Sequence, residues 1–437
     1  MQALDVWMNG ELIGTWRVDR GSHSFHYKES WLQSAHCRAL SLSLPINAAL
    51  EIKGEEVKHY FDNLLPDNEK IRSRISRKFK TKTDTFSLLN AIGRDCVGAV
   101  QLLPEGMTPD GWNQIQFEAL TENDIEEILL ATPSNNMSID DEDLLRISIA
   151  GAQEKTALLF YQNQWCKPKN STPTTHIFKL PLGVIGGGSA RVDFSDSVYN
   201  EWLCAEIMMA LGLPIASTSI GKFGKETVLI VERFDRKWMD NGTWIARLPQ
   251  EDFCQALGIS PEKKYEKDGG PTALNCLQLL QGSLNKSDGL FFMLTQLIFF
   301  LLAAPDGHAK NHSIFLQPGD NYEMTPLYDV LSAWPYIGSG TQNLNWHNAG
   351  MAMSLRGKNV HYKFKDIHAR HWKQLADKNG GELTWSAMLA LAEKVDEALN
   401  VVESQLPKDF PSKTSNAIFI GMRKATEKFL AESKQTE

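Results

Sequence analysis

The feature that most constrains this chain is a long uncharged segment that runs directly into a polar loop. Residues 289–305 carry no charged side chain and are followed at once by Asp306-Gly-His-Ala-Lys-Asn311. The segment is slightly short for a membrane span and contains Thr295 and Gln296. We therefore expect a buried core helix that ends in a polar loop, and a globular protein built around that helix.

The residues after this helix predict a second loop with acidic character. A strand over 313–316 and another around Tyr322 predict a hairpin, and Asp329 follows it. Asp306, Asn311 and Asp329 would then come within reach of one another. Phosphoryl transfer needs such groups, because one carboxylate orients the attacking hydroxyl while oxygen ligands hold the magnesium bound to ATP. A solvated turn rich in Asp, Gly and Asn is the alternative, and this stretch alone does not decide between them.

The charge of the whole chain argues against strong nucleic-acid binding by this chain alone. The chain has 437 residues, a formal net charge of -8 and a pI near 5.8. Strong nucleic-acid binding needs clustered Lys and Arg that neutralise phosphates, so we do not expect it of this chain alone. Residues 70–82 do carry seven Lys or Arg side chains. We interpret that run as the solvated face of a helix.

Cysteine spacing and the N-terminal residues predict a cytoplasmic protein. The six cysteines lie far apart and form no CxxC pair, so we expect reduced and mostly buried thiols rather than a zinc site or a disulfide framework. The N-terminal residues lack the basic and apolar regions of a secretory signal. The expected location is therefore the cytosol, with no membrane contact.

The order of predicted elements divides the chain into three parts. Residues 1–110 predict an α+β subdomain, residues 111–237 a lobe rich in strands, and residues 238–437 a mainly helical lobe. In the first part, Asn9-Gly10 between two apolar runs predicts a hairpin. In the last part, helices are expected to start at Leu248 and to run over residues such as 384–401.

The middle part carries features of a phosphate-binding lobe. Residues 147–160 read as strand, small-residue turn and strand, with the single glycine Gly151 where a protein-kinase loop has three. Lys179 lies in an alternating strand and is interpreted either as a surface residue or as a phosphate ligand. Residues 226–235 predict a strand buried on both faces. This order of elements is that of a kinase N-terminal lobe.

At this point the motifs resemble one known family along nearly the whole chain. They are, in order, Phe61-Asp-Asn-Leu-Leu-Pro-Asp67, Ile92-Gly-Arg-Asp95, Ser148-Ile-Ala-Gly-Ala-Gln-Glu-Lys155, Val231-Glu-Arg-Phe-Asp-Arg236, Leu248-Pro-Gln-Glu-Asp252, Asp306-Gly-His-Ala-Lys-Asn311 and Thr325-Pro-Leu-Tyr-Asp329. Together they make the sequence resemble the HipA family of toxin kinases. The resemblance implies an α+β fold with two protein-kinase-like lobes, an additional N-terminal α/β subdomain and a mainly helical C-terminal lobe.

The resemblance also implies the roles of individual residues. Asp306 would orient the substrate hydroxyl as the catalytic group together with Asn311, and Asn311 and Asp329 would be the magnesium ligands. Lys179 would hold the ATP phosphates with help from Lys155. The full set expected to bind the nucleotide is Ala150, Gly151, Lys155, Lys179, Glu232, Phe234, His308, Lys310, Asn311 and Asp329. Within it the backbone near Glu232 and Phe234 would receive adenine, and His308 would orient the loop.

Partners and regulation follow from the same resemblance. It implies a HipB-like helix-turn-helix antitoxin, operator DNA bound through the complex with that antitoxin, and a translation-linked protein substrate, for which glutamate–tRNA ligase is the family precedent. It also implies autophosphorylation on Ser148. Two alternatives stay open: a kinase of a small molecule, and a catalytically silent subunit that serves as corepressor.

Overall fold

The computed structural model describes residues 2–133, 147–148, 151, 153–187, 190–340 and 342–435. The chain forms two compact units. The first comprises Met1–Leu180, Gly221–Lys263 and Ser313–Glu323, and the second comprises Pro181–Ile220, Lys264–His312 and Met324–Glu437. None of the helices in the described ranges is long and apolar enough to cross a membrane.

The first unit opens with a five-stranded antiparallel sheet in the order β4-β3-β2-β1-β6. Asn9 and Gly10 both adopt positive φ, 46° and 84°, so they form the expected tight turn between β1 and β2. Trp16 of β2 is fully buried and stacks on Phe61 of α2 with ring centroids 4.0 Å apart. The elements of this N-terminal part are β1 (Gln2–Met8), β2 (Glu11–Asp19), β3 (Ser22–Tyr27), α1 (Glu29–Leu32), β4 (Glu51–Lys53), α2 (Glu55–Asp62), α3 (Glu69–Lys78), α4 (Thr85–Ile92) and β6 (Gln101–Pro104).

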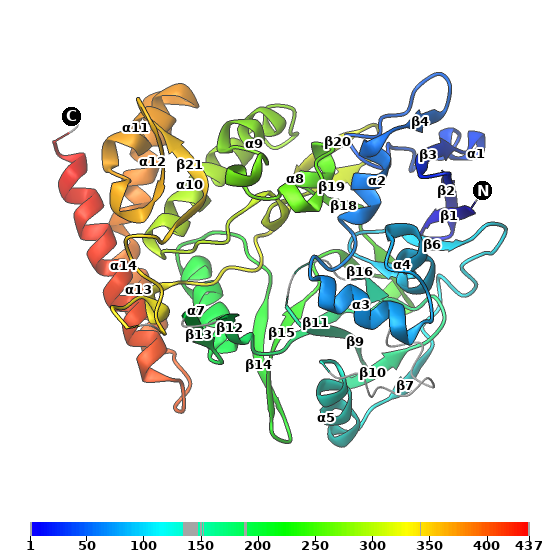
Figure 1. The fold of residues 1–437 in the computed structure, drawn as a ribbon, viewed down its shortest axis with the longest axis horizontal. Helices are drawn as coiled ribbons and strands as arrows, with labels where there is room; N and C mark the ends of the chain where they lie inside the picture. Colours follow the sequence, from blue (N-terminus) through cyan, green and yellow to red (C-terminus); the bar gives the residue numbers. More distant parts are fainter. Residues whose placement is uncertain are drawn as a thin grey trace. The chain divides into compact units, whose positions relative to one another are not determined.

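A six-stranded sheet follows in the same unit, in the order β14-β15-β11-β9-β10-β7 (Figure 1). Helix α5 (Glu122–Ala131) packs on it through Ile125 and Leu129, which join one apolar cluster with Phe178 and Ile230. Because side chains alternate along a strand, the neighbours of these residues face the other side of the sheet. The strands are β7 (Phe117–Ala119), β9 (Lys155–Tyr161), β10 (Gln164–Pro168), β11 (His176–Lys179), β14 (Thr218–Phe223) and β15 (Glu226–Glu232).

Smaller elements complete the first unit. A short parallel pair joins β5 (Asp95–Cys96) to β8 (Ile147–Ser148). A hairpin is formed by β16 (Arg236–Met239) and β17 (Trp244–Arg247). A third sheet has the order β18-β19-β20, so the predicted hairpin after residue 313 is confirmed. Its elements are β18 (Gln250–Asp252), α8 (Phe253–Ala256), β19 (Ser313–Gln317) and β20 (Asn321–Met324).

The second unit is mainly helical and is centred on α10 (Asp288–Leu301) (Figure 1). Ten of the fourteen residues of α10 are buried, which confirms the core helix predicted from the uncharged segment. The remaining helices are α7 (Ser197–Ala210), α9 (Ala273–Leu280), α11 (Ala369–Lys378), α12 (Gly381–Glu393), α13 (Val395–Ser404) and α14 (Ser412–Ser433). Two hairpins, β12 (Gly183–Gly187) with β13 (Ala190–Phe194) and β21 (Gly350–Arg356) with β22 (Val360–Lys363), complete the unit.

Two local expectations were wrong. The helix expected from Leu248 is instead strand β18 followed by the four-residue helix α8. Residues 250–252 pair with residues 313–315 of β19, and this long-range pairing overrides local helix propensity. The single helix expected over 384–401 is divided into α12 and α13 at Lys394. The mixed α+β class, with an N-terminal sheet subdomain and a helical C-terminal part, is confirmed.

Candidate functional site

Asp306 lies in the loop directly after α10. The helix closes at Ala303, which adopts a φ of 48°, and Ala304 N–H donates back to the Phe299 carbonyl at 2.7 Å. The Asp306 side chain is 49% exposed, so its carboxylate is accessible to a substrate. Oδ1 of Asp306 accepts a hydrogen bond from the Tyr265 hydroxyl and lies 3.6 Å from Nε2 of His308. The loop therefore presents an accessible carboxylate whose orientation is fixed from one side.

Asn311 is held from within the same loop. Its Nδ2 donates to the Asp306 carbonyl at 2.7 Å, and only 5% of the residue is exposed. Because a carbonyl must receive an N–H, this bond identifies which end of the carboxamide is nitrogen. Among the residues that the structure describes, none donates a hydrogen bond to Oδ1 of Asn311. That oxygen thus remains available as a ligand.

Gly307 lets this loop lie close to the core helix. A Cβ atom added at Gly307 would stand 2.3 Å from the ring of Phe299 in α10. Real Cβ atoms essentially never approach so closely, so any larger residue would displace either the loop or the ring. The glycine in the Asp306–Asn311 motif is therefore explained by packing.

Asp329 is placed by hydrogen bonds on both sides of it. Before it, Leu327 N–H donates to Pro214 O at 2.9 Å. After it, Ser332 Oγ donates to the Leu302 carbonyl at 2.6 Å, at the end of α10. Asp329 itself has a φ of 62°, a left-handed conformation that Asp tolerates better than most residues. The hairpin expected to carry it ends earlier, at Met324, so the attachment to α10 holds Asp329 in place.

One further contact joins the two loops. The hydroxyl of Tyr328 donates to the Lys310 carbonyl at 2.8 Å, so the residue before Asp329 touches the residue before Asn311. The structure therefore brings the loops of Asp306, Asn311 and Asp329 together at the C-terminal end of α10.

The other predicted residues of this loop are buried. His308 is 3% exposed and stands edge-on to the Tyr265 ring, with centroids 4.8 Å apart. Lys310 is 6% exposed. Burial, followed by the nearby His308, lowers the pKa of His312 to about 3, so that ring is neutral at physiological pH. Its Nε2 contacts the Gln296 side chain of α10 at 3.1 Å. These side chains support the loop from inside.

In the first unit, the two predicted phosphate-binding lysines are direct cross-strand neighbours. Lys155 of β9 is the register partner of Lys179 of β11. Both lie on the face of the sheet opposite Phe178 and α5, and Lys179 is 6% exposed. Cross-strand partners on one face of a sheet lie close together, so the structure brings the two predicted lysines side by side.

Gly151 and Ser148 lie at the start of the predicted phosphate loop. Gly151 has a φ of 112°, and a Cβ atom added there would stand 2.5 Å from Nζ of Lys155. Lys155 therefore reaches back over this glycine. Ser148 is fully buried, and its hydroxyl donates to the Leu64 carbonyl at 2.7 Å. Ala150, also predicted to bind the nucleotide, lies outside the described residues.

Glu232 and Phe234 lie at the end of β15. The ladder to β11 continues one step past the strand, because Arg233 N–H donates to Thr175 O at 2.9 Å. Glu232 is exposed, whereas Phe234 is half-buried and stands edge-on to Phe315 with centroids 5.8 Å apart. Their position where the strand ends is compatible with the predicted backbone contact to adenine.

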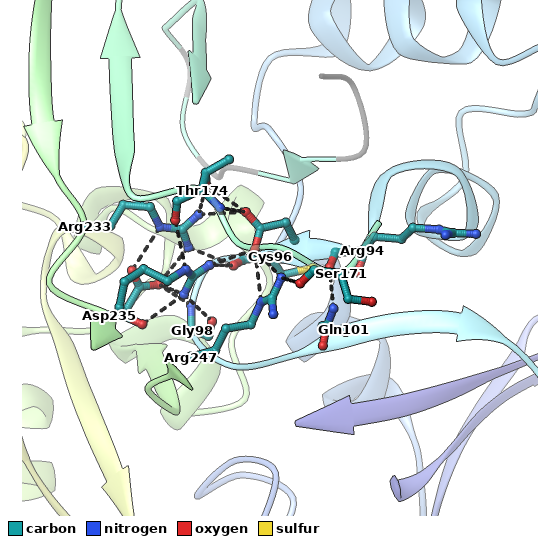
Figure 2. Close-up of polar contacts among 12 residues, drawn as sticks. Arg94, Cys96, Gly98, Gln101, Ser171, Thr174, Arg233, Asp235 and Arg247 are labelled. Atoms are coloured by element: carbon teal, nitrogen blue, oxygen red, sulfur yellow. Dashed lines mark hydrogen bonds and ion pairs between the residues drawn. The ribbon is translucent and has the colours of Figure 1, made fainter. Parts of the chain in front are cut away.

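A buried ionic cluster includes Arg233, the residue that directly follows β15. We call it the Asp95 cluster, and it consists of Asp95, Arg233, Asp235, Arg236 and Arg247 (Figure 2). Burial alone would raise the pKa of Asp95, but the three arginines hold it well below its usual range. Asp235 is affected in the same sense by Arg233 and Arg236. The cluster joins β5 to β15, β16 and β17.

Sequence reasoning missed Tyr265 and the Asp95 cluster as a unit. Tyr265 and Asp306 are 41 positions apart, and Asp95 and Arg236 are 141 apart. No short spacing could have revealed either contact, although Ile92–Asp95 and Val231–Arg236 were both recognised as family motifs.

The donor atoms near Asp306 fit a hard cation. Across the described ranges no group of three or more His, Cys, Asp or Glu side chains could hold a metal ion. Magnesium usually takes one or two protein carboxylates and completes its shell with water and substrate phosphates. The Asn311 carboxamide oxygen and the Asp329 carboxylate are oxygen donors of the kind that such a site uses.

Comparison with known proteins gives consistent matches. Residues 147–405 match the HipA-like C-terminal domain, and residues 4–103 match the HipA N-terminal domain. The putative kinase Y4mE of Sinorhizobium fredii is 35% identical over 386 residues, which cover 87% of this chain and 86% of that protein. The serine/threonine-protein kinase toxin HipA of Shewanella oneidensis is 29% identical over 349 residues, 76% of each chain.

A solved structure matches the fold. It is the complex of HipA, HipB and operator DNA from the toxin–antitoxin system of Shewanella oneidensis MR-1. The TM-score is 0.80 at 23% identity, and the match covers 99% of this chain and 98% of that one. The predicted kinase-like fold with an added N-terminal subdomain is thereby confirmed.

Proposed function

Because this chain belongs to the HipA family of serine/threonine protein kinases, we propose that it is the toxin of a toxin–antitoxin pair and phosphorylates a translation-linked protein. The membership rests on the domain matches and on the relative with 35% identity. A relative with 29% identity is named as a kinase toxin. One structural observation carries the catalytic assignment: the loops of Asp306, Asn311 and Asp329 meet at the end of α10.

In this proposal Asp306 accepts the hydrogen bond of the substrate hydroxyl and turns its oxygen toward the γ-phosphate. Its partial exposure and its hydrogen bond from Tyr265 support this role, since an orienting carboxylate must be both accessible and fixed. Asn311 contributes by holding the Asp306 backbone. His308 and Lys310 support the loop from its buried side.

The same proposal assigns the nucleotide and metal ligands. Asn311 Oδ1 and the Asp329 carboxylate would hold Mg²⁺, which supplies charge neutralisation on the phosphates when bound. Lys155 and Lys179 would neutralise phosphate oxygens from their shared position on the sheet. Gly151, with Ala150, would cover the phosphates, and the backbone at Glu232 and Phe234 would receive adenine.

Regulation and partners extend the proposal. Ser148 is the proposed site of autophosphorylation. Its complete burial implies that the hydroxyl must leave its contact with Leu64 before another molecule can modify it. The antitoxin would be a HipB-like DNA-binding protein through which the chain reaches operator DNA. The net charge of -8 agrees with a chain that needs such a basic partner. Glutamate–tRNA ligase is the substrate to test first.

Radiolabelled ATP tests this function directly. The purified chain is incubated with [γ-³²P]ATP and Mg²⁺, first alone and then with a host lysate or purified glutamate–tRNA ligase. We expect label on a serine or threonine, and its loss in the Asp306→Asn variant. Asp409→Asn is the matched control, because Asp409 is exposed and has no recorded polar contact among the described residues. Labelling of a small molecule, or none of any protein, would overturn the proposal.

A further inference from the structure

A second concave site lies where β9 and β15 end and β11 begins, in the six-stranded sheet. It has a volume of about 450 Å³ and is lined by residues that include Tyr161, His176, Glu232 and Trp238. His176 and Glu232 are register partners on β11 and β15. Since they alternate with the residues on the lysine face, they point away from Lys155 and Lys179. Tyr161 shares the face of Lys155 but lies six residues further along β9, roughly 20 Å at the rise of a strand, so the pocket is separate from the proposed phosphate site.

One wall of this pocket is aromatic. The rings of Tyr161 and Trp238 are nearly parallel, at 17°, with centroids 5.8 Å apart. Trp238 is 43% exposed, so part of its ring is accessible to a ligand. The faces of Trp and Tyr carry the negative part of the ring quadrupole, so they attract cations and repel anions.

The two arginines that line the pocket offer nothing to an anion. Arg233 donates all five of its N–H groups inward, to Asp95, Thr174, Asp235 and the Cys96 carbonyl (Figure 2). Arg236 donates its five to Asp95 and to four backbone carbonyls, those of Cys96, Gly98, Thr174 and Asp235. Three arginines against two aspartates leave the Asp95 cluster one positive charge in excess, and these carbonyl dipoles offset it locally.

The remaining ionisable groups favour a cation. Burial lowers the pKa of His176 to about 4, so its ring is neutral at physiological pH. Glu232 is exposed, and across the described ranges no hydrogen bond or ion pair involves its carboxylate. One uncommitted carboxylate therefore stands in a pocket with two parallel aromatic rings and no available cationic donor.

We propose that this pocket binds a guanidinium group, with Glu232 as its counter-ion and Tyr161 and Trp238 as its stacking surface. An arginine side chain matches these features, because its planar cation both pairs with a carboxylate and stacks on aromatic faces. The group comes either from a polypeptide partner or from a free small molecule, and the two sources share this chemistry.

Calorimetric titration of the full chain tests the proposal. The probe is Nα-acetylarginine amide, and its neutral isostere Nα-acetylcitrulline amide is the ligand control. We expect the arginine probe to bind and the citrulline probe to bind at least about tenfold more weakly, a difference of roughly 1.4 kcal/mol. Equal affinity of the two probes, or no heat from either at millimolar concentration, overturns the proposal.

Variants then locate the site. Glu232→Gln and Trp238→Leu should each weaken binding of the arginine probe by about fivefold or more. Glu226→Gln is the matched control, since Glu226 begins the same strand and does not line the pocket. Thermal melting checks that each variant is folded, and wild-type affinity in both pocket variants would contradict the assignment.

A second comparison distinguishes the two sources. The tripeptide acetyl-Gly-Arg-Gly amide is titrated alongside the single-residue probe. Tighter binding of the tripeptide assigns the pocket to a polypeptide, and equal or weaker binding assigns it to a free small cation.

Discussion

Lys155 and Lys179 stand directly opposite each other on neighbouring antiparallel strands of the first unit. Two ammonium groups in such positions repel each other, and the repulsion is stronger where the effective dielectric constant is low. Lys179 is almost completely buried, with 6% of the residue exposed. This placement agrees with the proposal that both lysines bind the phosphates of ATP.

Replacing either lysine should weaken ATP binding. We expect the rise in melting temperature caused by Mg-ATP to be largely lost in Lys179→Met and reduced in Lys155→Met, because bound ligand stabilises the folded chain in proportion to its affinity. Differential scanning fluorimetry at several ATP concentrations measures this. Lys222→Met, which removes an exposed charge on β14, should keep the wild-type response. An unchanged response in Lys179→Met would contradict the assignment.

Tyr265→Phe should slow catalysis without weakening nucleotide binding. The substitution keeps the ring against His308 and removes only the hydroxyl that donates to Asp306. Hydrogen bonds to charged groups contribute on the order of 1.5–3 kcal/mol, so we expect kcat to fall about tenfold or more. The ATP-induced thermal shift should stay as in the wild type. Equal losses of kcat and of ATP affinity would indicate that Tyr265 merely supports the fold.

Phosphorylation of Ser148 should inactivate the chain. A phosphate adds roughly -1.5 to -2 charges, which the fully buried contact with Leu64 cannot accommodate. The segment would have to leave its position, and Gly151 and Lys155 would be displaced from the nucleotide. We expect Ser148→Asp to lose ATP binding, while Ser148→Ala should lose about 1 kcal/mol of stability and keep activity.

Mass spectrometry after incubation with Mg-ATP checks the Ser148 prediction. Phosphate should appear on Ser148 at an initial rate that rises with the square of protein concentration, because a buried serine must reach the active site of another molecule. Phosphate found only elsewhere, or full ATP binding by the modified form, would contradict it.

A rise in pH from about 4.5 to 8 should destabilise the first unit through Glu251. Burial raises the pKa of Glu251 from 4.5 to about 8, and its Oε1 accepts the Leu42 N–H at 2.9 Å. The stabilisation is therefore fully present below pH 4.5 and is lost as the pH rises through about 8. We expect Glu251→Gln to flatten the decline of melting temperature between about pH 4.5 and 8. A decline as steep as in the wild type would rule out this origin.

Asp95→Asn should be strongly destabilising. It removes one of two carboxylates from a cluster with three buried arginines, and breaking a buried pair typically costs about 3–5 kcal/mol. Because the arginines hold the pKa of Asp95 below 3.8, the same stabilisation is present above that pH and is lost on acidification through the lower folded value. Urea unfolding of Asp95→Asn and of the exposed control Asp19→Asn measures it. Equal midpoints would show the cluster to be energetically unimportant.

Sequence alone predicted elements whose signal is local. Asn9-Gly10 specifies a hairpin through its own backbone preferences, and the uncharged residues before Asp306 specify a buried helix. It failed at residues 250–252, whose strand pairing depends on Ser313–Phe315 far along the chain. Local propensity carries no information about a pairing strand that lies far away in the sequence.

In the candidate site too, contacts within one motif could be predicted from the sequence, whereas long-range contacts could not. Asp306 and Asn311 stand five positions apart in one motif, so their proximity could be read directly. The hydrogen bonds from Tyr265 and Ser332 are long-range contacts that no sequence motif predicts. The roles of the site residues themselves stay predictions until the variants above are measured.

The common attachment of two loops to the end of α10 has a mechanical consequence. Ser332 and Ala333 bind the carbonyls of Leu302 and Ala303, and the Asp306 loop grows from the same turn. Any translation or tilt of α10 therefore moves both loops together. The spacing between Asp306 and Asp329 should vary less than the position of either one, so thermal motion of the unit leaves the relative alignment of the two carboxylates nearly constant.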